Sequence, residues 1–163
     1  MPRRGTFISV GKSLDQAVER VKRAETLGYE STYVTHIAGR DSLTVLMAYA
    51  ADTERIKLGT GVLPIYSRTP VATAQQAATI DEYSGGRMAL GIGISHQVTV
   101  ENWFQSRIER PLLAMREYVG ILRACFGART RRRARSSGRG SASWASSRGP
   151  SFRSTWRRFL RTC

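Results

Sequence analysis

Apolar residues in the first 127 positions follow two alternating patterns, short continuous runs and stretches with helical spacing. The short runs are rich in β-branched and aromatic residues, which favours buried strands. They predict four strands, at residues 6–10, 31–36, 56–62 and 87–94. Each predicted strand is followed by a segment in which a helix is expected.

The predicted helices are recognised by the residues that begin and end them. Ser13 lies at the start of a capping box, and apolar residues then recur at helical spacing up to the stop at Gly28. Asp41 or Ser42 is expected to cap a second helix. Pro70 begins a third, because proline is favoured at the first helical position. These helices complete an alternation of strands and helices.

The alternation predicts an α/β fold with parallel strands. The strands begin 25, 25 and 31 residues apart, which is the spacing of βαβ units. Right-handed crossovers leave two architectures, an open doubly wound sheet or a (β/α) barrel. Four units are half of the eight that a barrel contains, and composition does not separate the two.

Candidate functional residues lie where the strands end, which is where chemistry gathers in both architectures. The glycines there have a plain structural explanation, since glycine in a strand often permits close packing or a bulge. The segment GIGISH lacks the third glycine of a dinucleotide-binding fingerprint. A histidine at such a position can also be purely structural, but the only two histidines both fall at strand ends. The candidates are His36, Gly59, Thr60, Gly61, Gly91, Gly93, Ser95 and His96.

Three stretches together resemble one known family. IKLGTGVLPIYSRTP, SGGRMALGIGISH and PLLAMREYVGILRA are similar to segments of the luciferase-like oxidoreductases, which use FMN or the deazaflavin coenzyme F-420. The resemblance runs from about residue 7 to 126 and is closer to the F-420-dependent members. It implies a TIM-type barrel, a small-molecule substrate, and a cofactor lying across the C-terminal ends of the strands.

The resemblance also implies roles for individual residues. His36 matches a histidine beside the reacting ring and is the candidate proton donor or acceptor. The expected cofactor contacts come from strand 3, where a non-prolyl cis peptide is expected at Gly61–Val62, and from strand 4. His96 departs from the family, because some relatives carry an acidic residue there. The residues expected to contact the cofactor are Gly59, Thr60, Gly61, Gly91, Gly93 and Ser95.

The half-barrel interpretation carries expectations about association and activity. Four strands leave two open sheet edges, which favour homo-oligomers or aggregation. Phe7, Val34, Leu58 and Leu90 are expected to line the barrel interior without an opposite layer. Later barrel loops often hold the cofactor's phosphate. The chain as written is therefore expected to be impaired as an enzyme and to bind cofactor weakly.

Charge divides the chain at Ala128. The first 127 residues hold 15 Lys and Arg against all 12 Asp and Glu, a net charge of +3, whereas residues 128–163 hold eleven Arg and no Lys, Asp or Glu. Read one base earlier with GC-rich codons, residues 144–159 become MGLEPRPELPIYLAAL, which resembles the fifth strand of the family. We therefore expect a half barrel at 1–127 and a disordered, out-of-frame tail at 128–163. The alternative is an Arg-rich arm that binds nucleic acid, and non-specific binding to polyanions is expected in either case.

Other classes of protein have little support. The two cysteines, Cys125 and Cys163, have no metal-ligand or redox spacing, so neither a metal site nor a disulfide is expected. No stretch approaches the roughly 18 apolar residues of a membrane span, and the N-terminus is a poor signal peptide. A cytoplasmic protein is expected. A non-catalytic barrel fragment remains a further alternative.

Overall fold

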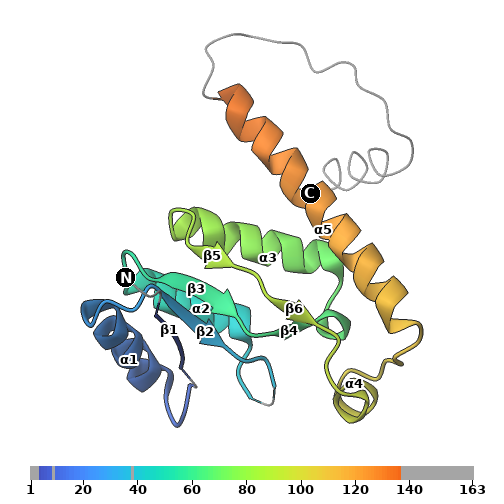
Figure 1. The fold of residues 1–163 in the computed structure, drawn as a ribbon, viewed down its shortest axis with the longest axis horizontal. Coiled ribbons are helices and arrows are strands. Elements are labelled where there is room, and N and C mark those ends of the chain that lie inside the picture. The colour runs from blue at the N-terminus through green and yellow to red at the C-terminus, as the bar shows by residue number, and fades with distance from the viewer. Residues whose placement is uncertain (1–3, 9, 38, 137–163) are drawn as a thin grey trace. The chain divides into compact units, whose positions relative to one another are not determined.

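Four parallel strands form the main sheet of the computed structural model, which describes residues 4–8, 10–37 and 39–136 (Figure 1). The strands follow the order β1-β2-β3-β5 and pair in the parallel sense throughout. This arrangement confirms the predicted α/β fold with parallel βαβ units. The strands are β1 (Gly5–Phe7), β2 (Ser31–Val34), β3 (Lys57–Thr60) and β5 (Met88–Ala89).

One predicted strand ends early and another is divided. Within the segment 56–62 only β3 forms, and a new strand, β4 (Leu63–Pro64), begins beyond the segment. The segment 87–94 divides into β5 and β6 (Ile92–Gly93). At the interruption, the Thr60 hydroxyl accepts a hydrogen bond from the Gly91 amide at 2.9 Å and donates one to the Gly91 carbonyl at 2.7 Å. A side chain thus takes the place of a strand partner, and β4 and β6 pair with each other instead.

Three helices follow the first three strand segments and begin at the predicted caps. The cap side chains of Ser13, Asp41 and Thr69 each accept a hydrogen bond from the amide three residues further on. Such a bond satisfies one of the amides that a helix start leaves without a partner. The helices are α1 (Leu14–Thr26), α2 (Ser42–Ala51) and α3 (Pro70–Tyr83), with a short 3-10 turn η1 (Ile65–Ser67) before α3.

Two further helices complete the described chain. The short helix α4 (Gln97–Trp103) was not predicted, and α5 (Pro111–Ser136) begins at a proline, which is favoured at the first helical position. The expected boundary after Gly127 falls inside α5, because alanine and arginine are good helix formers and continue the helix. Residues 137–163, which hold most of the expected disordered tail, lie outside the described residues. Contacts divide the chain into two units, Met1–Arg131 and Arg132–Cys163, and the sheet, the core and the candidate site all belong to the first.

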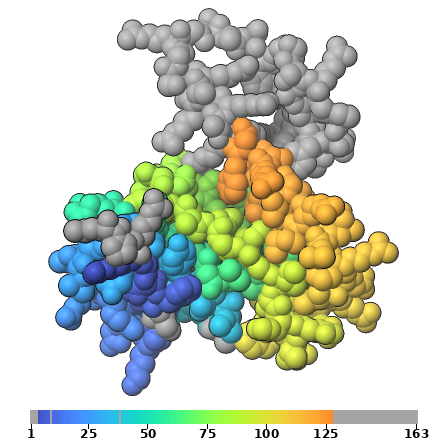
Figure 2. All heavy atoms as spheres, viewed as in Figure 1, coloured from blue at the N-terminus to red at the C-terminus, as the bar shows by residue number. Residues whose placement is uncertain are grey.

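Two clusters of buried side chains form the core. The larger cluster lies between the sheet and the helices α1 and α2, and its members include Val21, Val34, Leu43, Leu46, Tyr49 and Leu58. The smaller cluster joins η1 and α3 to α5 through Ile65, Ala74, Tyr118 and Leu122. Outside these clusters, α4 and the first turn of α5 lie at the surface (Figure 2) and expose apolar side chains such as Trp103 and Leu112.

The prediction that Val34 and Leu58 line a barrel interior is wrong. Val34 is 3% exposed and Leu58 is 0% exposed, and both pack in the core cluster with the helices. Successive strand residues point to opposite faces, and the most apolar rows are the ones that the helices cover. Leu90 packs against both core clusters. Phe7, the remaining residue of the predicted interior, is 64% exposed, and the helices do not cover its side chain.

Arg87 joins the ends of two helices to the sheet. Its guanidinium donates to the Ala50 and Thr53 carbonyls at the end of α2 and to the Ser84 carbonyl after α3. It also donates to the Ile56 carbonyl and the Thr53 hydroxyl. Helix C-termini leave carbonyls without intrahelical partners and favour a positive charge. One side chain therefore fixes α2 and α3 against the start of β5.

Two absences are recorded for the described residues. No helix there is long and apolar enough to cross a membrane. Within 4–8, 10–37 and 39–136, no group of three or more His, Cys, Asp or Glu side chains is placed to hold a metal ion. Association through the edge strands β1 and β5, and polyanion binding by the Arg-rich segment, stay predictions.

Candidate active site

One face of the sheet carries a row of aromatic side chains and glycine. Phe7, Tyr33, Gly59 and Ala89 are register partners across β1, β2, β3 and β5, so they share the face opposite to the helix-packed residues. The Phe7 and Tyr33 rings lie 5.4 Å apart between centroids, with their planes tilted by 32°. We call the surface made by Phe7, Tyr33, Gly59, Gly61 and Val62 the open face.

The glycines of the open face let the aromatic rings lie against the backbone. A Cβ atom at Gly59 would lie 2.5 Å from the Tyr33 ring, and one at Gly61 would lie 2.6 Å from the Phe7 ring. Both distances are too short for real atoms, so neither position accepts a side chain without moving its neighbour. These two predicted site residues therefore border the open face and have a packing role as well.

The predicted cis peptide is present between Gly61 and Val62. It lies where β3 gives way to β4. Val62 is 45% exposed. Gly93 on β6 packs against Val62, since a Cβ at Gly93 would lie 2.6 Å from Val62 Cγ2. The structure thus places Gly61, Val62 and Gly93 next to one another, and cofactor contacts at Gly61 and Gly93 stay predictions.

Thr60 and Gly91 lie behind the open face. The Thr60 side chain is on the helix-packed side, as the register partner of Val34, and its hydroxyl is committed to Gly91. A Cβ at Gly91 would lie 2.2 Å from the Thr60 carbonyl oxygen, so the backbones of the two strands approach too closely for any side chain. The plain explanation of a glycine that permits close packing therefore holds for Gly91.

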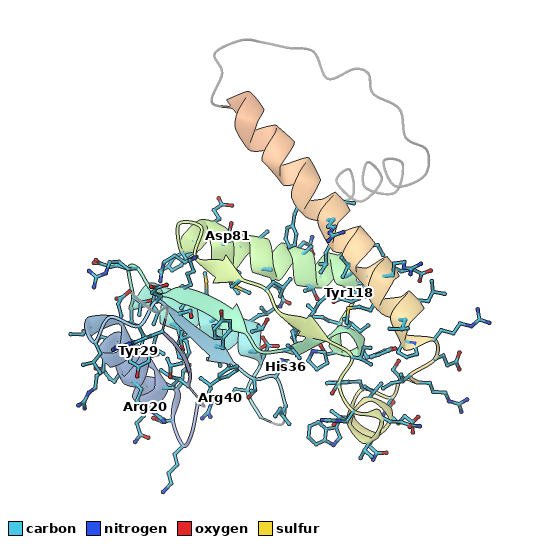
Figure 3. The ribbon with its side chains drawn as sticks, in the orientation of Figure 1. Arg20, Tyr29, His36, Arg40, Asp81 and Tyr118 are labelled. Carbon is cyan, nitrogen blue, oxygen red and sulfur yellow. The ribbon has the colours of Figure 1, made fainter. Side chains whose placement is uncertain are left out.

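His36 lies just beyond the end of β2 (Figure 3) and is largely enclosed, with 11% of its side chain exposed. Its Nδ1 atom lies 3.0 Å from the Ser42 hydroxyl and 3.3 Å from the Ser42 amide nitrogen at the start of α2. A backbone amide can only donate, so Nδ1 must accept. The neutral ring then carries its proton on Nε2.

Two charged residues lie next to His36. Asp41 Oδ2 is 3.7 Å from Nδ1 and forms an ion pair with the Arg68 guanidinium. Burial lowers the pKa of His36; the Asp41 carboxylate raises it, the Arg68 charge lowers it, and the net effect is a pKa below its ordinary value. Burial raises the pKa of Asp41, but hydrogen bonds from Thr44 and Arg68 outweigh burial and hold that pKa below its usual range. The site therefore contains a neutral imidazole and a neutralised carboxylate.

The remaining predicted residues lie at the start of α4. Ser95 adopts a left-handed backbone with φ of 70°, uncommon for a residue other than glycine. His96 is exposed, and its carbonyl accepts the first hydrogen bond of α4 from Val100. Within the described part of the chain, no contact joins His36 to His96. Instead Phe104, just after α4, lies 6.5 Å from the His36 ring between centroids.

Sequence reasoning missed the roles of Asp41, Arg68 and Phe104 around His36. Asp41 was predicted only as a helix cap, and Arg68 lay inside the motif SRTP without an assigned role. The available signal was the charge of both side chains near strand ends. It did not show that residues 27 positions apart would pair.

Comparison with known proteins identifies the family. The family model described as luciferase-like monooxygenase matches residues 1–150. The chain belongs to this family. The luciferase-like chain is 43% identical over 108 residues to a 5,10-methylenetetrahydromethanopterin reductase of Archaeoglobus fulgidus, covering 63% of the chain and 31% of the reductase. It therefore spans about a third of the length of this curated relative.

Solved structures confirm the fold of the luciferase-like chain. The coenzyme F-420-dependent tetrahydromethanopterin reductase of Methanopyrus kandleri superposes with a TM-score of 0.66 at 26% identity, covering 74% of this chain and 39% of that one. The oxygenating constituent of 3,6-diketocamphane monooxygenase from Pseudomonas putida, solved with FMN, gives a TM-score of 0.67 at 18% identity. It covers 76% of this chain and 39% of its own, and its likeness shows the fold alone. The TIM-type α/β fold implied by the resemblance is thus confirmed.

Proposed function

We propose that this luciferase-like chain carries the part of an oxidoreductase that holds F-420 or FMN at the carboxyl ends of its strands. The observation that carries the proposal is the combination of an open aromatic face with a neutral His36 at the end of the adjoining strand β2. Two relatives support F-420 over FMN. The reductase of Methanopyrus kandleri is F-420-dependent by name, and the relative from Archaeoglobus fulgidus is also named as a reductase of a tetrahydromethanopterin compound.

The residues present fit a flat heteroaromatic ring. Phe7 and Val62 offer exposed apolar surface, and Gly59 and Gly61 let the Tyr33 and Phe7 rings lie against the backbone beneath that surface. Such a surface suits a planar ring, because ligand sites combine apolar walls with a few placed polar groups. We propose that Gly93 and Ser95 complete this cradle from the β5–β6 side, with Thr60 and Gly91 supporting it from behind.

His36 supplies the polar group of the proposed site. Its Nδ1 is occupied by Ser42, which leaves the Nε2 proton as the one that the ring can donate. F-420 or FMN would supply the redox chemistry itself by carrying a hydride, while the protein provides placement and electrostatics. His36 would hold or move a proton at Nε2, and the apolar side chains would exclude water from it.

A spectroscopic titration tests this function. Two proteins are compared: the 163-residue chain, and the product obtained when translation after Gly127 continues in the alternative frame. We expect the longer product to quench F-420 fluorescence, or to perturb FMN absorbance, with saturation at micromolar concentrations. The 163-residue chain is expected not to saturate there. Failure of the longer product to bind either cofactor would contradict the proposed function.

A further inference from the structure

We propose that Arg68, by pairing with Asp41, acts as a positioning residue that keeps His36 neutral, with its proton on Nε2. The use of that proton rests on the function proposed above. The protonation state of the ring is a property of the chain alone. It can be measured without any cofactor.

The first step of the inference concerns the hydrogen bonds to Nδ1. The Ser42 amide points a hydrogen at this atom from 3.3 Å, and the Ser42 side chain is fully buried beside it. A protonated ring would place a second hydrogen against that amide. An imidazolium at the start of α2 would also face the positive end of the helix dipole. Both effects favour a ring whose Nδ1 carries no proton.

The second step concerns Asp41, whose carboxylate lies close enough to stabilise a charged ring. Its Oδ1 accepts from the Thr44 amide at 2.8 Å and from the Thr44 hydroxyl at 2.9 Å. Its Oδ2 is paired with Arg68 and stays 3.7 Å from His36 Nδ1. Because both oxygens are engaged elsewhere, Asp41 makes no hydrogen bond to His36.

The third step is that Arg68 is held in place by other elements. Its guanidinium donates to Gln76 on α3 at 2.5 Å, and its carbonyl accepts from the Tyr118 hydroxyl on α5 at 3.3 Å. The Arg68 side chain is 16% exposed, so little solvent screens its charge. The charged groups that act on His36 are thus Asp41 and Arg68, while the α4 end contributes the apolar Phe104.

The test is a pH titration of the His36 ring nitrogens by NMR in the full 163-residue chain. A His96→Gln background leaves His36 as the single histidine, which removes the assignment problem. We expect the neutral ring to carry its proton on Nε2. Arg68→Gln should free Asp41 to turn toward Nδ1 and raise the His36 pKa by about one unit, the usual size for an uncompensated neighbouring carboxylate.

The opposite substitution should give the opposite sign. Asp41→Asn removes the negative charge but keeps a good helix cap, so the His36 pKa is expected to fall. Arg68→Lys retains the charge and should restore most of the lowering. Gln76→Ala is the control: it removes one hydrogen-bond partner of Arg68 but neither charge, so the His36 pKa should shift much less than in Arg68→Gln.

Two results would overturn the proposal. One is a neutral ring with its proton on Nδ1 when Asp41 and Arg68 are both present, a result that needs neither charge variant to fold. The other is a His36 pKa that shifts in the same direction in Arg68→Gln and Asp41→Asn, as a general loosening of the site would cause. Because these measurements need no cofactor, failure of F-420 or FMN to bind would count against the proposed function and leave this inference intact.

Discussion

A His36→Gln variant of the longer product is expected to turn over about 10²-fold more slowly than wild type, the lower end of the usual contribution of a positioned acid or base. Glutamine preserves polarity and approximate size but cannot give up or take up a proton at neutral pH. Its effect on cofactor affinity should be much smaller, since the open face supplies most of the proposed contact. The measurement is kcat alongside the cofactor Kd for both proteins.

The control for this prediction is His96→Gln. His96 is exposed and contributes its carbonyl rather than its ring to α4, so turnover should stay near the wild-type value. Equal losses of turnover and affinity in His36→Gln would indicate a structural role for His36 and contradict its role in proton transfer.

The pH dependence has a defined sign. The pKa of His36 lies below its ordinary value because burial disfavours the charged ring. The neutral ring therefore contributes stability that is present above the unfolded-state pKa and is lost as pH falls through the folded-state pKa. Turnover that depends on the neutral ring should persist through the ordinary histidine range and decline only below it.

A Gly91→Ala variant is expected to lose about 3 kcal/mol of unfolding free energy, the upper end of the usual cost of overpacking. The added Cβ would lie 2.2 Å from the Thr60 carbonyl oxygen, which is a backbone atom and cannot rotate away. The backbones of β3 and of the β5–β6 segment would have to separate. That movement would also strain the hydrogen bonds between the Thr60 hydroxyl and Gly91. Urea unfolding followed by circular dichroism measures the loss.

Gly120→Ala is the matched control. Gly120 lies in α5, and a Cβ there would have no atom within 4 Å outside its own helix neighbourhood. Alanine in a helix interior is more favourable than glycine by about 0.5–1 kcal/mol, so this variant should be as stable as wild type or more stable. Similar unfolding free energies for the two variants would show that the close approach at Gly91 is not a constraint.

The elements of this fold were predictable where local chemistry decides them. Ser13, Asp41 and Thr69 cap helices through bonds to amides three residues away, so the sequence pattern contains the whole interaction. The end of β3 at Thr60 and the division between β5 and β6 were not predictable in the same way. It depends on Thr60 meeting Gly91, 31 residues further along the chain.

The candidate site shows the same division. The position of His36 at a strand end followed from the strand pattern, and the cis peptide at Gly61–Val62 followed from the family resemblance. Apolar composition failed to show which sheet face the helices cover, and so Leu58 was assigned to the wrong one. The pairing of Asp41 with Arg68 required the structure, because it joins the start of α2 to the loop before α3.

The most direct test of the proposed cofactor site compares three forms of the longer product: the wild type, Phe7→Asp and Leu27→Asp. The quantity measured is the affinity of each for F-420 or FMN. The two side chains are equally exposed, 64% and 63%, so neither substitution buries a charge. Phe7 lies on the open face, whereas Leu27 lies at the end of α1. If the cofactor packs on the open face, Phe7→Asp should weaken binding at least tenfold while Leu27→Asp binds like wild type. Equal affinities in all three proteins would contradict the placement of the cofactor on this face.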